Sequence, residues 1–148
     1  MASYDTNFLF DERGNLSMEL FSKRAQDVLW GIHAWLCEQR RRMFLPLDLL
    51  IVLVDRGFVP LARAVAEGTE GAVLPGDVLP RLRALAEEIE EEASEEEPVF
   101  SRSYFSRGFT RILAEAGEQA RARSEDLIRE EDLARSIIWR AEAVESAS

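Results

Sequence analysis

Between residues 22 and about 41, large apolar side chains recur every three or four positions. This spacing places them on one face of a helix, so it predicts an amphipathic helix packed against a core. The run Arg40-Arg41-Arg42 follows, and positive charge is favoured at the negative end of a helix dipole, so we expect the helix to end there. The apolar positions are Ala25, Val28, Leu29, Ile32, Trp35 and Leu36.

Three shorter helices are predicted next. Pro46 suits a first helical turn, and residues 47–55 form an apolar helix that Gly57 ends. A strand is the alternative for LLIVLV, which contains β-branched residues, but no partner strand appears nearby. We expect a third short helix at residues 59–66. Asp77 is expected to cap a fourth, whose apolar face consists of Val78, Leu82, Leu85, Ala86 and Ile89.

Helical spacing returns in the last third of the chain. Residues 106–123 predict a long amphipathic helix, residues 129–139 predict a final one, and residues 140–148 are expected to fray. The fold class is therefore all-α: a compact helical domain of about six helices. A chain of 148 residues suits one such domain.

Two segments do not fit the helical pattern. Residues 1–20 are irregular, yet they contain Tyr4, Phe8, Leu9, Phe10, Leu16, Met18 and Leu20, so we expect this extension to pack on the domain. A disordered tail or a leader sequence is the alternative. Residues 87–97 contain eight glutamates. Because like charges repel and resist packing, we interpret residues 87–98 as a helix end and a solvated linker.

Two parts of the chain resemble each other. Matching residues are separated by a constant offset, equal to the sequence separation between Phe21 and Phe105. Repeat one, residues 21–86, begins with Phe-Ser-Lys, and repeat two, residues 105–139, begins with Phe-Ser-Arg. The same offset relates Asp48-Leu49 to Asp132-Leu133. A gap-free match across two helices and the turn between them predicts two helix–turn–helix repeats packed about a pseudo-twofold axis.

In each repeat, Phe-Ser opens a long amphipathic helix and a short apolar helix follows. The short helices are FLPLDLLIVLV from Phe44 and IREEDLARSII from Ile128. This pattern resembles the double-repeat N-terminal domain of Clp-type AAA+ unfoldases over about residues 21–139. The resemblance implies a Clp N-domain-like fold and a domain that receives substrates and adaptor proteins.

The chain departs from that family in two ways. Where the family usually has a Glu-His pair, this chain has Leu47-Asp48 in the first repeat and Glu131-Asp132 in the second. Only nine residues follow Trp139, so about half of the second repeat is missing. Either the chain is a fragment, or the apolar face of the last helices is covered by residues 4–20 or by a second copy of the chain.

The resemblance also implies candidate binding residues. In some bacterial family members, two symmetric pockets bind phosphorylated arginine through the Ser or Thr at each helix start and the Glu of each Glu-His pair. By position these residues are Ser22 with Leu47, and Ser106 with Glu131, so the first pocket lacks its acid. The alternative is that both serines only cap their helices. Trp30 lies off the apolar stripe and is a further candidate contact for a partner or for the N-terminal extension.

Charge and composition narrow the function classes. The net charge is −10, which repels a polyanion, so we expect no nucleic-acid partner. With one cysteine, Cys37, and one histidine, we expect neither a disulfide nor a metal site. This composition suits a reducing, cytoplasmic location. The apolar run 49–54 is too short for a bilayer and no signal peptide is visible, so no membrane partner is expected.

Little in the sequence points to catalysis. No GxxxxGK[ST] motif is present, so the chain has no P-loop and is not itself the unfolding motor. His33 and Cys37 lie one helical turn apart and could in principle activate a thiolate, but no oxyanion hole or orienting acid is visible nearby. The acidic run 87–97 offers carboxylates without a pocket, and metal binding there is a weak alternative. We expect no enzyme and no cofactor.

Three functional hypotheses result. The first is a protein-binding module that recruits substrates or adaptor proteins to a AAA+ unfoldase or protease, which predicts a stable monomer. The second is a self-associating structural or regulatory protein, such as a homodimer. The third is a helix-turn-helix DNA-binding domain that uses residues 127–139, although Glu130, Glu131 and Asp132 disfavour it.

Overall fold

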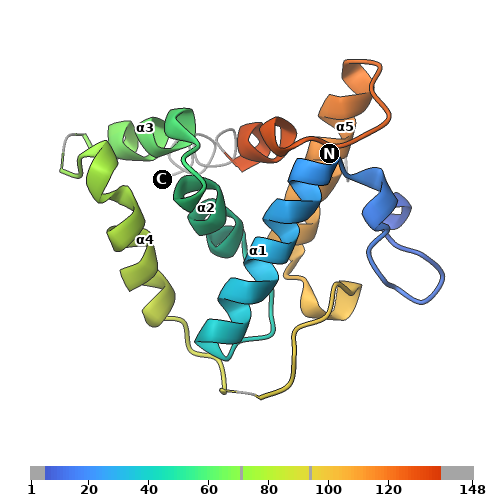
Figure 1. Ribbon diagram of the computed structural model, residues 1–148, viewed down its shortest axis with the longest axis horizontal. Coiled ribbons are helices and arrows are strands. Elements are labelled where there is room, and N and C mark those ends of the chain that lie inside the picture. The colour runs from blue at the N-terminus through green and yellow to red at the C-terminus, as the bar shows by residue number, and fades with distance from the viewer. Residues whose placement is uncertain (1–5, 71, 94, 138–148) are drawn as a thin grey trace.

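The computed structural model describes residues 6–137 except residues 71 and 94 (Figure 1). Tyr4, the predicted end of the last helix at Trp139 and the predicted frayed tail 140–148 lie outside these residues. Within the described part the chain forms helices and no extended strand, only isolated bridges, which confirms the predicted all-α class. None of these helices is long and apolar enough to cross a bilayer. The helices are α1 (Lys23–Gln39), α2 (Pro46–Asp55), α3 (Val59–Gly68), α4 (Val78–Glu87), α5 (Arg107–Ala122) and the helical residues 130–137.

Local chemistry explains where the helices begin and end. Helix α1 ends at Gln39, slightly before the predicted boundary, because Arg40 adopts a left-handed conformation with φ 57°. Residues 46–55 are a helix and not a strand: Pro46 occupies the first turn, and the Asp48 carboxylate accepts a hydrogen bond from the Leu45 amide. The prediction that Asp77 caps α4 is wrong. Its side chain makes no capping bond, since a 3-10 turn, η3 (Pro75–Asp77), leads directly into the helix.

The main core lies where α1, α2 and α5 meet. Its centre is a cluster of aromatic rings. The Phe44 and Phe109 rings stack with centroids 5.5 Å apart, and Phe105 packs edge-on against both, at 4.9 Å. Such aromatic pairs add to the free energy gained from burial alone. A smaller apolar cluster continues under α3 and α4, formed by Ile51, Ala66, Val78, Leu82 and Ala86. Figure 1 shows α3 and α4 at one end of the molecule, with α2 between α4 and α1.

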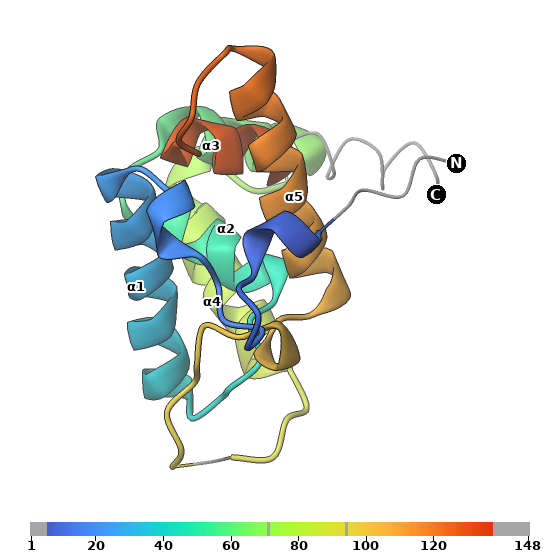
Figure 2. The same ribbon diagram turned by 90° about the vertical axis from the view of Figure 1, so that its right-hand side faces the viewer.

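The N-terminal segment from residue 6 is part of this core. Leu9 is fully buried, and Phe10 and Leu16 are buried with it. Phe8 packs so closely on α5 that a Cβ added at Gly117 would lie 2.7 Å from the Phe8 Cζ atom. The backbone is tied down as well, because the Leu16 amide donates to the Phe100 carbonyl at 2.9 Å. Figure 2 shows the segment lying along the side of the molecule where α1 and α5 face each other.

The arginine run after α1 does more than complement the helix dipole. Arg41 is buried and donates to Glu91, which also accepts a bond from the Arg42 amide at 3.0 Å. The Arg42 side chain forms an ion pair with Glu96 at 2.9 Å. The interpretation of residues 87–98 as a merely solvated linker is therefore wrong in part: two of its glutamates fasten it to the end of α1. These pairs were not foreseen because the charges lie far apart along the chain.

Several elements begin at positions related by the offset between Phe21 and Phe105. The 3-10 turns η2 and η4 begin at Met18 and Arg102, α1 and α5 begin at Lys23 and Arg107, and α2 and the last helix begin at residues 46 and 130. The isolated parallel bridges are reciprocal under the same offset: Phe21 pairs with Ile128, and Phe44 pairs with Phe105. The pseudo-twofold relation itself stays a prediction.

Candidate functional site

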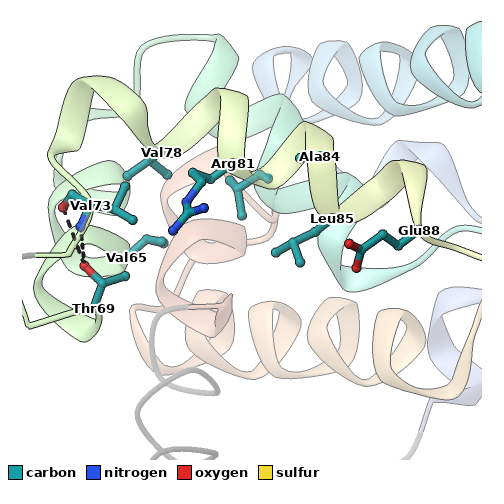
Figure 3. A pocket seen from close by; sticks show the side chains of 9 residues that line it. Val65, Thr69, Val73, Val78, Arg81, Ala84, Leu85 and Glu88 are labelled. Atoms are coloured by element: carbon teal, nitrogen blue, oxygen red, sulfur yellow. Dashed lines mark hydrogen bonds between the residues drawn. The ribbon is translucent and has the colours of Figure 1, made fainter.

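An apolar hollow lies at the surface between α3 and α4. It is a groove with a volume of about 400 Å³. Figure 3 shows side chains from both helices projecting into it, with the Arg81 side chain between Val65 and Leu85 and Glu88 at one end. We call it the α3–α4 groove. It is lined by Val65, Thr69 and Val73 on the α3 side, and by Val78, Arg81, Leu82, Ala84, Leu85 and Glu88 on the α4 side.

Buried residues and a hydrogen-bonded turn form the floor of the α3–α4 groove. Val78 and Leu82 are buried in the smaller apolar cluster. The turn after α3 is closed by Thr69, whose hydroxyl donates to the Ala66 carbonyl at 2.6 Å and accepts from the Val73 amide at 3.0 Å. These two bonds join the end of α3 to Val73 at one side of the groove.

Leu85 distinguishes this groove from ordinary surface. The spacing along α4 places Leu85 on one face with Leu82, and both line the groove, but Leu82 is buried whereas Leu85 is 52% exposed. The apolar face of α4 is thus wider than the part of it that packs in the core, where Val78, Leu82 and Ala86 are buried. Leu74, before η3, is 65% exposed. Exposed apolar residues around a concave surface are typical of protein-binding sites.

A second hollow, between α1, α2 and α4, is more polar. It has a volume of about 640 Å³, and its lining combines apolar residues with charged residues from the three helices, Glu38, Asp55 and Arg83. The ion pair between Arg83 and Asp55, at 3.2 Å, lies at its edge. Filling this hollow with an apolar group would require removing these charges from water, which is costly. The α3–α4 groove is the better candidate for an apolar ligand group.

The predicted site serines both act as helix caps. The Ser22 hydroxyl accepts a hydrogen bond from the Ala25 amide at 3.2 Å, and the Ser106 hydroxyl accepts one from the Phe109 amide at 3.1 Å. Each bond satisfies one of the amides that a helix start leaves without a partner. Both serines are half-buried.

The structure places each serine beside the short helix that follows the other long helix. The Ser22 amide donates to the Ile128 carbonyl at 2.8 Å, which brings it next to the helix that carries Glu131. The Ser106 amide donates to the Phe44 carbonyl at 3.0 Å, next to the helix that carries Leu47. The neighbours are thus crossed relative to the pairs Ser22 with Leu47 and Ser106 with Glu131.

Near Ser22, the carboxylate that makes ion pairs is Glu130. It lies 3.8 Å from Arg24 and 3.8 Å from Arg56, and the three residues line a hollow of about 300 Å³. Glu131 is half-buried beside it. Two arginines, Arg24 and Arg56, thus face the single carboxylate of Glu130, so positive charge is in excess in this hollow.

Trp30 is 53% exposed and packs edge-on against Phe100, with ring centroids 4.8 Å apart. This ring does not belong to the N-terminal extension, and the predicted contact of Trp30 with a partner stays a prediction. Phe100 comes from the segment before η4 (Arg102–Tyr104).

The α3–α4 groove was not visible in the sequence as a site. Its residues follow the same helical spacing as core residues, and only the packing of α4 on its neighbours shows which of them are left exposed. No protein-family model matches this chain, and neither a curated protein nor a solved structure is significantly similar to it.

Proposed function

We propose that this chain is a cytoplasmic protein-binding module of Clp N-domain type, which recruits substrates or adaptor proteins to a AAA+ unfoldase or protease. In this proposal the chain has no enzymatic activity of its own. The observation that carries the proposal is the apolar α3–α4 groove, with Leu85 52% exposed at its margin.

The reciprocal backbone pairs support the Clp N-domain type. The Ser22 amide donates to the Ile128 carbonyl, and the Ser106 amide donates to the Phe44 carbonyl. Ser106 follows Ser22, and Ile128 follows Phe44, by the same number of residues, so each segment makes the same hydrogen bond to the other. Asp48 and Asp132 each accept a hydrogen bond at 2.9 Å from the amide three residues earlier. Bonds that repeat in this way are what two pseudo-twofold-related helix–turn–helix units would produce. The family resemblance rests on those same units.

The groove favours an amphipathic segment of a partner protein. Its apolar floor accepts one or two large aliphatic or aromatic side chains, as in helix-in-groove recognition. Arg81 lies among the lining residues and Glu88 at one end, so a partner segment that carries a carboxylate beside its apolar anchor and a cation at one side would match both. Ser22 and Ser106 act in this account only as caps.

Self-association is the second candidate, because an exposed leucine at a groove can also meet another copy of the chain. The two candidates differ in mass: the recruitment module is a monomer of 16.8 kDa at micromolar concentration, and the self-associating protein is a dimer. Sedimentation equilibrium of the wild type and the Leu85→Glu variant separates them.

Affinity capture from a lysate of the source organism tests the proposal. The wild-type chain is compared with Leu85→Glu and with Leu127→Glu, a matched change at another exposed leucine outside the groove. We expect a AAA+ unfoldase, its protease or its adaptors to be enriched by the wild type and Leu127→Glu and lost with Leu85→Glu. Equal enrichment by all three chains would refute the groove as the binding site, and capture of the chain's own copies alone would refute recruitment.

A further inference from the structure

Three potential metal ligands meet at the surface of α1, outside the α3–α4 groove. His33 and Cys37 lie one turn apart, and the His33 Nδ1 and Cys37 Sγ atoms are 4.0 Å apart. Glu97 comes from the segment after α4, and its Oε1 atom is 3.9 Å from the His33 Nε2 atom. One donor atom from each residue lies within 4.8 Å of the other two.

The surroundings hold this cluster in place. The His33 ring packs beside two aromatic rings that also contact each other, with centroids 5.3 Å from Trp30 and 5.8 Å from Phe100. The chain around Glu97 is anchored on one side by the Arg42–Glu96 ion pair and on the other by Pro98, which is buried. Glu97 itself is 79% exposed, so its carboxylate can still move to a ligand.

The arrangement does not suit a thiol nucleophile. A histidine and a carboxylate beside a cysteine suggest a catalytic triad, and Glu97 supplies the acid that the sequence did not reveal. Yet partial burial and, second, the negative charge of Glu97 raise the pKa of the Cys37 thiol. Reactive cysteines need a lowered pKa, so this thiol stays protonated at neutral pH unless a cation displaces its proton.

We propose that His33, Cys37 and Glu97 bind one divalent transition-metal ion of the zinc class. Two ligands at positions i and i+4 of a helix reach the same ion, as in helical zinc motifs. Nitrogen, sulfur and carboxylate oxygen together are the donors that zinc takes, at about 2.0–2.3 Å, which places tetrahedral ligands roughly 3.3–3.8 Å apart. Only one His33 nitrogen binds the ion, and one donor atom from each residue lies within 4.8 Å of the other two, so the donors need to approach by about 1 Å. Rotation of the exposed Glu97 side chain supplies the approach of the carboxylate, and small rotations of His33 and Cys37 supply the rest.

The ion replaces the thiol proton, which is released to solvent, so binding strengthens as the pH rises. Water fills the fourth position, because three protein ligands leave one open. A bound ion also fastens the acidic segment to α1 at Glu97, next to its anchors at Glu91 and Glu96. The sequence did not reveal this site because Glu97 lies far from Cys37 along the chain. It also lies within a run of glutamates, and nothing in the sequence distinguishes it from the others.

Titration of the reduced full chain with Co²⁺ tests this site, because a cobalt–thiolate bond gives a near-ultraviolet charge-transfer band. We expect the band to saturate at one ion per chain and Zn²⁺ to displace the cobalt. Cys37→Ser removes the band, while Glu97→Gln and His33→Gln weaken binding about tenfold or more. Glu95→Gln, which removes the same charge from the same segment, is the control and leaves binding within about twofold.

Two results would overturn the site. One is the absence of a thiolate band in the wild type at millimolar Co²⁺ while circular dichroism shows a folded helical chain. The other is equal affinity in Glu97→Gln and Glu95→Gln, which would mean that Glu97 is not a ligand. Neither result bears on the α3–α4 groove, so this inference and the proposed function fail independently.

Discussion

Arg41 and Asp48 form a buried ion pair through two parallel hydrogen bonds, of 2.8 Å from Nη1 to Oδ1 and 3.0 Å from Nη2 to Oδ2. Asp48 is completely buried, and its Oδ1 atom also accepts a bond from the Trp35 indole at 2.9 Å. The pair joins the end of α1 to the first turn of α2. A buried charge is tolerated only when it is fully paired, so these residues depend on each other.

Removing one partner is therefore expected to be costly. Asp48→Ala leaves the Arg41 guanidinium buried without its main acceptor, and the free energy of unfolding should fall by about 3–5 kcal/mol. Urea unfolding followed by circular dichroism measures the change. Asp55→Ala, which breaks the exposed pair with Arg83, is the control and should change stability by about 1 kcal/mol or less. Similar losses for the two variants would contradict the special role of the buried pair.

Leu9 tests whether the N-terminal segment belongs to the folded domain. Its side chain is completely buried, so Leu9→Ala should lower the free energy of unfolding by about 2–5 kcal/mol through lost burial and the cavity left behind. Leu74→Ala, at a leucine that is 65% exposed, should stay within about 0.5 kcal/mol of the wild type. If Leu9→Ala is as stable as Leu74→Ala, the segment does not contribute to the core.

The fold was largely predictable because short-range signals determine it. Apolar spacing located the six helices, Pro46 and Gly57 bounded α2, and the Ser22 cap marked the start of α1. Contacts between distant residues were not predictable. Nothing in a periodic pattern shows that Arg41 turns inward to meet Asp48, or that Leu85 is left outside the core. The groove and the cluster at His33 arise from such contacts, so they required the structure.

The two capping serines offer a test of their structural role. Ser22→Ala and Ser106→Ala should each reduce the free energy of unfolding by about 0.5–2 kcal/mol, because the amide three residues later loses its acceptor. Ser22→Asp and Ser106→Asp, which keep an oxygen at the cap, should restore most of it. Thermal denaturation of the four variants measures this. If the alanine variants keep full stability, the serines are not needed as caps, and a ligand-binding role becomes the better interpretation of their positions.

The Cys37 thiol provides a pH-dependent readout. Because burial and Glu97 raise the pKa of the thiol, less thiolate is present at pH 7–8 than in a free cysteine, and alkylation by iodoacetamide should be slower. The side chain is exposed, so access does not limit the rate. Glu97→Gln removes the repelling charge and should accelerate alkylation near neutral pH, and the two chains should converge at high pH, where both thiols are ionised. An unchanged rate in Glu97→Gln would show that the carboxylate does not act on this sulfur.

Site-specific photo-crosslinking tests the central claim, that partners bind in the α3–α4 groove, most directly. A photoreactive amino acid is placed at position 85 in the groove, or at position 127 outside it, and the chain is irradiated in cells of the source organism. The account predicts that position 85, and not position 127, forms adducts with a AAA+ unfoldase, its adaptors or its substrates. Adducts of the same proteins from both positions, or no adduct from position 85, would contradict it.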